Sequence, residues 1–293
     1  LTDVATDADV AFLYHEDSKY ALEFMPPLNK PDTNIMDKNS YVRIFDTMYR
    51  PFFDLSAQTA IVHPNQAFEK YPLLVVPALY AADNALLERL QSYAENGGHL
   101  LITFRSGYGD EFARARWERG PGPLRTAVGA SYTEYSNLFY PIAVSSDKLT
   151  LHTDAMATAW TDGLELEGAE SLVEYVHPHF GRYPAITTQV FGKGRVTYCG
   201  TLPNPSLGKT LAKYVLAQAN VQLPFEDLPP TVRVITGKAT SGKKLFFFTN
   251  WSWDTVQLPA IPGGGTELFS HQPLANNDRL SIGSWDVKIV VQG

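Results

Sequence analysis

The chain has 293 residues, of which 44% are hydrophobic and 19% charged, and its formal net charge is −7. A chain of this length buries roughly three quarters of its unfolded surface, which is enough for two domains with a substantial core. The acidic balance lacks the basic stripe that nucleic-acid binding requires, and no segment approaches the roughly 20 apolar residues that cross a bilayer. We therefore expect a globular protein whose partners are neither nucleic acid nor membrane.

The single cysteine, Cys199, rules out an internal disulfide and a thiolate zinc cluster. It lies in an apolar run, RVTYCG, which predicts an inert buried thiol. The segment Leu1–Asp9 is acidic and polar, unlike a signal peptide. We expect a cytoplasmic location, with secretion left open if a signal was removed upstream, and no cofactor or metal.

The first hundred residues contain apolar runs of strand length that alternate with helical patterns. The expected strands are Asp9–His15, Gln58–His63, Pro72–Tyr80 and His99–Phe104. Near-continuous apolar strands separated by helices indicate a parallel sheet covered on both faces. This pattern predicts a doubly wound, flavodoxin-like α/β domain.

Two helices are expected between these strands. Ser40 can cap a helix that Pro51 should end or kink, and its apolar positions follow helical spacing at Tyr41, Ile44, Phe45, Met48 and Tyr49. Asp83 can cap a second helix that ends at Gly97, with one apolar face made of Leu86, Leu90, Tyr93 and Ala94.

The rest of the chain divides at a proline-rich linker. Residues 128–200 carry short strand-like runs, and Asn204-Pro205 opens a last helix that stops near Asn220. Pro224, Pro229 and Pro230 form the linker, and the turn signals beyond them predict a small antiparallel β-sandwich. We expect one domain at 1–222 and a second at 223–293.

A doubly wound sheet binds ligands where its parallel strands end. His15-Glu16-Asp17 follow the first strand, Ala81 and Asp83 the third, and Arg105–Glu111 (RSGYGDE) the fourth. Ser106 has Phe104 two positions earlier instead of the glycine that a nucleophile elbow requires, so we expect a local hydrogen bond there. Arg105, Asp110 and Glu111 are the candidate binding residues of this loop. Catalytic carboxylates in a retaining glycosidase lie about 5 to 5.5 Å apart. Asp110 and Glu111 are adjacent in the sequence, so in an extended loop their side chains tend to diverge, and we expect them to make loop or interface contacts instead.

Aromatic and imidazole pairs provide two further candidates. Trp251 and Trp253 lie two positions apart on a strand-like segment, so they should face the same side and could contact a sugar or an interface. His177 and His179 lack an identifiable third metal ligand, and a strand end entering a turn is expected there.

Several stretches, in this order, resemble family 42 β-galactosidases beyond their catalytic barrel: Tyr71–Tyr80, Tyr93–Thr103, Ser106–Glu111, Gly120–Arg125, Pro184–Gln189 and Phe191–Tyr198. The resemblance implies a class I glutamine amidotransferase-like domain that has lost its catalytic residues and mediates trimer assembly. Lys244–Asn250 is similar to the start of the family's C-terminal β-domain. Arg105 departs from the pattern, because an uncharged residue is expected before Ser106-Gly107.

The resemblance also implies where the chemistry of the family resides. Its two catalytic glutamates lie on an N-terminal (β/α)₈ barrel, and the acid/base glutamate follows an asparagine. This chain has no Asn-Glu dipeptide and is too short for that barrel, so no catalytic residue is carried over. The leading hypothesis is a non-catalytic assembly portion of a β-galactosidase, whose partners are two further copies and/or a family 42 barrel. A free-standing carbohydrate-binding protein and an amidotransferase-like hydrolase using Ser106, or Asp110 and Glu111, are the alternatives.

Overall fold

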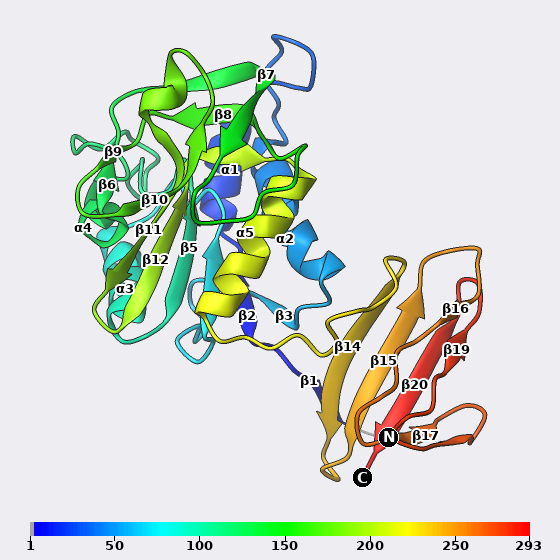
Figure 1. Cartoon of the computed structure of the whole chain (residues 1–293). Helices are drawn as coiled ribbons and strands as arrows, with labels where there is room; N and C mark the ends of the chain where they lie inside the picture. Colours follow the sequence, from blue (N-terminus) through cyan, green and yellow to red (C-terminus); the bar gives the residue numbers. More distant parts are fainter. Residues whose placement is uncertain (1–2) are drawn as a thin grey trace. The chain divides into compact units, whose positions relative to one another are not determined.

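A computed structural model describes residues 3–293 and shows a mixed α/β fold with large sheets and few helices (Figure 1). The chain divides into two compact units. The larger contains Val10–Pro51 and Ala60–Val221, and the smaller contains Leu1–Asp9, Phe52–Thr59 and Gln222–Gly293. In residues 3–293 no helix is both long and apolar enough to span a bilayer.

The larger unit is built around a ten-stranded sheet. Its spatial order is β13 (Thr201–Pro203), β8 (Met156–Asp162), β7 (Tyr135–Ser145), β10 (Glu170–Tyr175), β11 (Pro184–Phe191), β12 (Gly194–Cys199), β5 (His99–Thr103), β4 (Leu73–Val76), β2 (Val10–Leu13) and β3 (Thr59–Val62). The strands β12, β5, β4 and β2 pair in parallel. Every residue of β2, β4 and β5 is buried, as the apolar runs predict.

Helices cover the parallel strands. They are α1 (Glu16–Phe24), α2 (Ser40–Asp54), α3 (Asn84–Glu95), the short α4 (Arg125–Val128) and α5 (Pro205–Gln218). In the sheet, the chain moves toward one edge on going from β2 to β3 and toward the other edge on going from β4 to β5. Because crossover connections are right-handed, the helices of these two connections lie on opposite faces of the sheet. Figure 1 shows α3 on one side of these strands and α5 on the other.

Helix ends follow the predicted capping signals in two cases. The side chain of Asp83 accepts a hydrogen bond from Leu86 N at the start of α3, and that of Asn204 accepts one from Leu207 N at the start of α5. The expected end of a helix at Pro51 is wrong: α2 continues through Pro51 to Asp54. Helix α1 was not expected, because it buries only Ser18 and Leu22 and so carries little apolar periodicity.

The hairpin between β11 and β12 depends on a glycine at its turn. Phe191 pairs with Gly194 at its end. A Cβ added to Gly194 would lie 2.2 Å from the carbonyl oxygen of Gly98, so this close approach of two backbones requires glycine. Cys199 of β12 is fully buried, as predicted, and burial raises the pKa of its thiol to about 12.

The smaller unit has a six-stranded sheet and a separate two-stranded one. The larger sheet is ordered β1 (Val4–Thr6), β14 (Val232–Ala239), β15 (Lys244–Asn250), β20 (Val287–Gln292), β17 (Gly265–Glu267) and β18 (Pro273–Leu274), and β16 (Val256–Gln257) pairs with β19 (Ser281–Ile282). Its edge strand β1 comes from the start of the chain, so Val4–Thr6 lie with the second domain expected at 223–293.

The segment Phe52–Thr59 also belongs to the smaller unit. The side-chain amide of Gln58 donates to the Val234 carbonyl at 3.1 Å and accepts from Thr236 N at 2.8 Å. Arg233 forms an ion pair with Asp54. These contacts fix the segment along β14.

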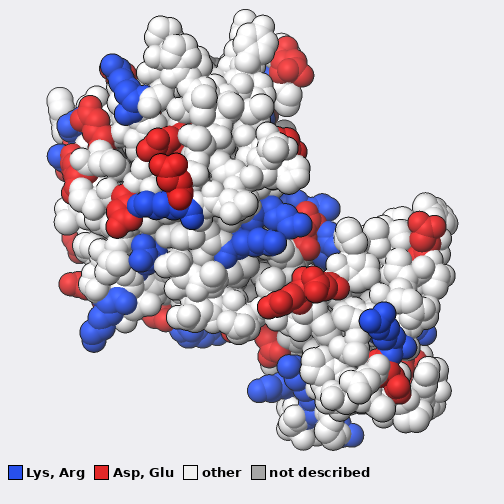
Figure 2. Space-filling model, viewed as in Figure 1, with Lys and Arg blue, Asp and Glu red and all other residues white. Residues whose placement is uncertain are grey.

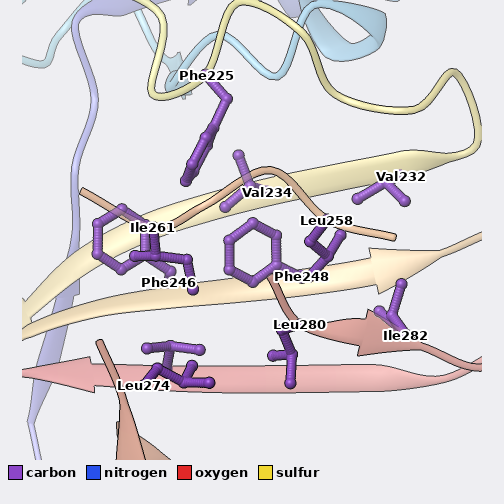
Figure 3. Packing of buried hydrophobic residues seen from close by; sticks show 11 residues of the cluster. Phe225, Val232, Val234, Phe246, Phe248, Leu258, Ile261, Leu274, Leu280 and Ile282 are labelled. Atoms are coloured by element: carbon purple, nitrogen blue, oxygen red, sulfur yellow. The ribbon is translucent and has the colours of Figure 1, made fainter. Parts of the chain in front are cut away.

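A compact apolar core holds the smaller unit together (Figure 3). Phe248 is fully buried, with its ring centroid 5.5 Å from that of Phe225 and 6.2 Å from that of Phe246. The other members are Val232, Val234, Leu258, Ile261, Leu274, Leu280, Ile282 and Val290.

Replacing Phe248 with alanine should lower the free energy of unfolding of the smaller unit by about 3–5 kcal/mol, because it removes a large buried ring and leaves a cavity. Chemical denaturation followed by circular dichroism measures this loss. Phe269→Ala is the control, since Phe269 is 64% exposed in the same unit. Equal losses in the two variants would contradict the packing described here.

Candidate functional site

Arg105 lies just beyond the end of β5 in a backbone conformation that side chains rarely adopt. Its φ is 67°, in the left-handed region, and only 8% of the residue is exposed. Its guanidinium lies 4.0 Å from the ring centroid of Tyr108, and further aromatic rings surround it, with centroids 5.0 to 5.6 Å away: Tyr80, Tyr135 and Trp160. Its buried Nε has no hydrogen-bond partner within residues 3–293, and the surrounding aromatic faces attract the cation.

The turn that follows β5 is tight, and Ser106 is not exposed in it. The buried Ser106 instead accepts a hydrogen bond at Oγ from Leu79 N at 3.1 Å, a local contact as expected. Gly107, two positions after Arg105, has a φ of 68° and lies so close to Pro121 that a Cβ would be 2.3 Å from its carbonyl oxygen.

A buried carboxyl group lies beside this cluster. Asp162, at the end of β8, is fully buried, and it accepts hydrogen bonds of 2.8 Å from Trp160 Nε1 and from the Tyr198 hydroxyl. Burial raises the pKa of Asp162 to about 7, although both hydrogen bonds and the charge of Arg105 act to lower it. Sequence reasoning missed Asp162, because a lone aspartate in a strand-like run gives no signal of its partners.

The ends of β2, β3 and β4 open onto a hollow of about 400 Å³. It gathers polar side chains named from the sequence, together with others: His15, Glu16, Asp17, His63, Asp83, Arg89 and Glu111. Several have structural roles, because His15 caps α1, Asp83 caps α3 and Arg89 binds the carbonyls of Pro64 and Gln66. In the part of the chain that the structure describes, no group of His, Cys, Asp or Glu could hold a metal ion.

The two adjacent loop carboxylates separate. Asp110 accepts hydrogen bonds of 2.9 Å from the backbone N–H groups of Phe112 and Arg114, whereas Glu111 lines the hollow. The histidine pair named from the sequence also has a local role: His177 Nδ1 accepts hydrogen bonds from the backbone N–H groups of His179 and Phe180 at the turn. Arg105, Asp110 and Glu111 therefore do not converge on one site.

The two tryptophans singled out from the sequence lie after β15, outside any strand. The Trp251 and Trp253 rings both contact Trp285, with centroids 6.1 and 5.7 Å apart from it. All three are more than half exposed. The third tryptophan was missed, because it lies more than thirty positions away along the chain.

Strand β7 presents a further exposed aromatic surface. It pairs with β8 along one edge but meets β10 only at Val144 and Ser145. Phe139 and Tyr140 lie where the register with β8 shifts, and they are 52% and 75% exposed. A bulge of this kind interrupts the ladder and directs side chains outward.

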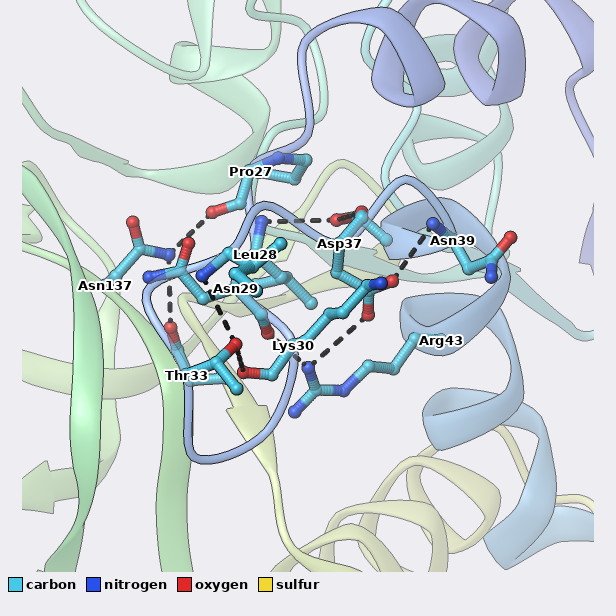
Figure 4. A network of polar contacts seen from close by, with 12 residues as sticks. Pro27, Leu28, Asn29, Lys30, Thr33, Asp37, Asn39, Arg43 and Asn137 are labelled. Carbon is cyan, nitrogen blue, oxygen red and sulfur yellow. Dashed lines mark hydrogen bonds and ion pairs between the residues drawn. The ribbon is translucent and has the colours of Figure 1, made fainter.

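A loop beside β7 extends this surface (Figure 4). Asn137 of β7 donates to the Pro27 carbonyl at 2.6 Å, and Arg43 donates to the Asn29 carbonyl at 2.8 Å. The same loop carries Ile35 and Met36, which are 62% and 63% exposed. We call these two residues, with Phe139 and Tyr140, the β7 surface.

Comparisons with known proteins agree on one family. Residues 8–222 match the family described as the β-galactosidase trimerisation domain. The chain is 30% identical over 292 residues to a β-galactosidase of Heyndrickxia coagulans, which covers 99% of this chain and 42% of that protein. It is 28% identical over 253 residues to a β-galactosidase of Geobacillus kaustophilus, covering 86% of this chain and 36% of that protein.

Solved structures give the same fold. The β-galactosidase from Bacillus circulans sp. alkalophilus superposes with a TM-score of 0.90 at 21% identity, over 100% of this chain and 42% of that one. The enzyme from the haloarchaeon Halorubrum lacusprofundi gives 0.81 at 26% identity, over 100% and 41%. The chain thus spans less than half the length of the relatives it matches.

The buried Asp162 predicts a pH dependence of stability. Because its pKa is raised in the folded state from an ordinary 3.8 to about 7, folding favours its protonated form. Its contribution is therefore fully present below about pH 4 and is lost as the pH rises through about 7. In Asp162→Asn this loss should disappear. The free energy of unfolding should then change between pH 4 and 8 by about 1–3 kcal/mol less than in the unaltered protein. Urea unfolding across this range measures it, with the exposed Asp147→Asn as a control, and an unchanged profile in Asp162→Asn would contradict the assignment.

Proposed function

Because the chain belongs to the family 42 glycoside hydrolases through its β-galactosidase trimerisation domain, we propose that it assembles copies of a β-galactosidase and takes no direct part in catalysis. The match over residues 8–222 carries this proposal. The whole protein is proposed to hydrolyse terminal β-D-galactosides with carboxylates on a family 42 barrel outside these residues. Residues 1–222 would form the trimerisation domain and 223–293 an accessory β-sandwich, with the strand β1 added at its edge.

We further propose that the larger unit is a doubly wound, flavodoxin-like domain of the class I glutamine amidotransferase type. The spatial order β3-β2-β4-β5 supports this, since it is the flavodoxin-like order in which the first strand lies between the second and third. The left-handed conformation of Arg105 just after β5 supports it as well, since a sharp, strained turn after a strand is where enzymes of related folds hold a nucleophile. A guanidinium cannot act as a nucleophile, and Ser106 is buried in a local hydrogen bond, so this geometry favours assembly over the hydrolase alternative.

The β7 surface is proposed to contact another copy of the chain in a homotrimer. Strand β7 carries no charged residue, and Figure 2 shows a largely uncharged surface over β7 and β8. Residues 135–143 of β7 pair with β8 along one edge, and along the opposite edge they pair with no strand in residues 3–293. The bulge at Phe139 and Tyr140 hinders sheet extension, so we propose that these side chains dock instead into the neighbouring copy.

We also propose a cytoplasmic location. The only cysteine is buried with a raised thiol pKa, and no disulfide can form within the chain. A fold that does not depend on disulfides is compatible with a reducing compartment.

Light scattering of the purified chain tests the assembly proposal. We expect a mass three times the 32.5 kDa of one copy. Phe139→Lys should shift the population to monomer, because it places a charge in an apolar contact. Phe269→Lys, at an exposed aromatic of the smaller unit, should leave the trimer intact. A strict monomer at high concentration would refute the assembly role, and a trimer that tolerates Phe139→Lys would refute only this surface.

A further inference from the structure

We propose that the outer face of helix α1 meets the β7 surface of a neighbouring copy. The inference rests on the assembly role proposed above and names the second half of its interface. A closed ring of three identical copies uses a heterologous interface, in which one patch of each copy meets a different patch of the next copy. The β7 surface is one such patch, so a trimer requires another on the same chain.

The outer face of α1 carries two large aromatic side chains in water. Phe24 is 88% exposed and Tyr20 is 61% exposed, and they share one side of the helix because they lie four positions apart. Ser18 and Leu22, the buried residues of α1, lie two positions before them. Since each residue turns a helix by about 100°, both rings lie opposite the buried side. The Lys19 ammonium lies 5.6 Å from the centroid of the Tyr20 ring, so Phe24 is the less covered of the two. We call Tyr20 and Phe24 the α1 face.

A hollow beside β7 has the size to take one aromatic ring. It measures about 130 Å³ and is lined by Leu138, Phe139 and Pro141 of β7. The loop that carries Lys30 lines it as well (Figure 4). For comparison, a cavity of roughly 150 Å³ holds one benzene molecule. Phe24 of a neighbouring copy therefore fits this hollow, in the way that aromatic anchors fill pockets at the centres of interfaces.

The charges of the two surfaces are complementary. Helix α1 contains three acidic residues and one basic residue: Glu16, Asp17, Glu23 and Lys19. The hollow is lined by two basic residues and one acidic residue: Lys30, Arg43 and Asp32. The exposed Glu23 directly precedes Phe24, so a copy that inserts Phe24 brings this carboxylate toward the basic side chains. Charges of opposite sign around an interface select the partner and fix its orientation.

Other exposed aromatic side chains fit this role less well. Phe112 and Trp117 lie in the loop after β5, and residues 110–119 contain three acidic and three basic residues. This loop therefore has no net charge to complement the hollow. The guanidinium of Arg114 also lies over the Phe112 ring, 4.8 Å from its centroid. The exposed tryptophans of the smaller unit lie outside residues 8–222, which match the trimerisation domain.

Light scattering of Phe24→Lys tests the pairing. Because a charge replaces the anchor, the concentration at which half of the copies are assembled should rise at least about tenfold. The measured mass should then fall toward the 32.5 kDa of one copy. Trp117→Lys is the matched control, since it changes a fully exposed ring of the same unit and should leave the trimer intact. The far-UV circular dichroism of both variants should match that of the unaltered chain, because neither side chain is buried.

Cross-linking tests directly whether the two surfaces meet. Met25→Cys places a thiol next to Phe24, and Lys30→Cys places one at the hollow. Both positions are exposed, whereas the natural Cys199 is fully buried and should not react. The two variants are mixed while dilute, so that copies exchange, and are then concentrated. A short bismaleimide should join them into a heterodimer in far greater yield than the homodimer of either variant alone.

The outcomes separate this pairing from the assembly role. A trimer that tolerates Phe24→Lys would overturn the pairing and leave the assembly role standing. The same holds if the mixed cysteine variants give no heterodimer although the unaltered chain is trimeric. Equal loss of the trimer in Trp117→Lys would overturn the choice of the α1 face. A strict monomer of the unaltered chain would refute the assembly role and this pairing together.

Discussion

The carboxyl group of Asp162 is fully buried, and the larger unit must supply it with donors. Trp160 and Tyr198 do so from β8 and β12, which lie in different parts of the ten-stranded sheet. The same tryptophan stacks on Phe104 next to β5 and on Tyr135 of β7. This polar centre and its aromatic surround connect the parallel strands to the β7–β8 hairpin, so the exposed surface of β7 depends on it.

The sequence predicted best what local patterns encode. The four apolar runs became β2, β3, β4 and β5, and Asp83 and Asn204 cap helices because their signals lie within three residues of their partners. The helix that begins at Ser40 was predicted, but its continuation past Pro51 was not, because continuation past a proline depends on packing that no local pattern records. The place of β1 beside β14 was missed for a related reason: a pairing across more than two hundred residues leaves no periodic trace in three residues.

For the candidate sites, too, the sequence predicted which residues follow the strands but not how distant residues pack around them. The strand-end residues His15, Asp83 and Glu111 gather at one hollow, as parallel topology implies. Arg105 was named as a departure from the family pattern, but only the structure shows its left-handed backbone angle and the aromatic rings around it. In that position the long cation lies among aromatic rings: those of Tyr80, Tyr108, Tyr135 and Trp160.

The smaller unit is assembled from three separate stretches of chain, and this has a topological consequence. The backbone passes between the units at residues 9–10, 51–52, 59–60 and 221–222. A protease that cut only the proline-rich linker would therefore leave Val4–Thr6 and Phe52–Thr59 attached to the larger unit, and only noncovalent contacts with these stretches would hold residues 231–293. For the same reason the β1 edge must wait for residues 232–239 to leave the ribosome before it can pair, so this strand pairing forms only after more than two hundred further residues have been made.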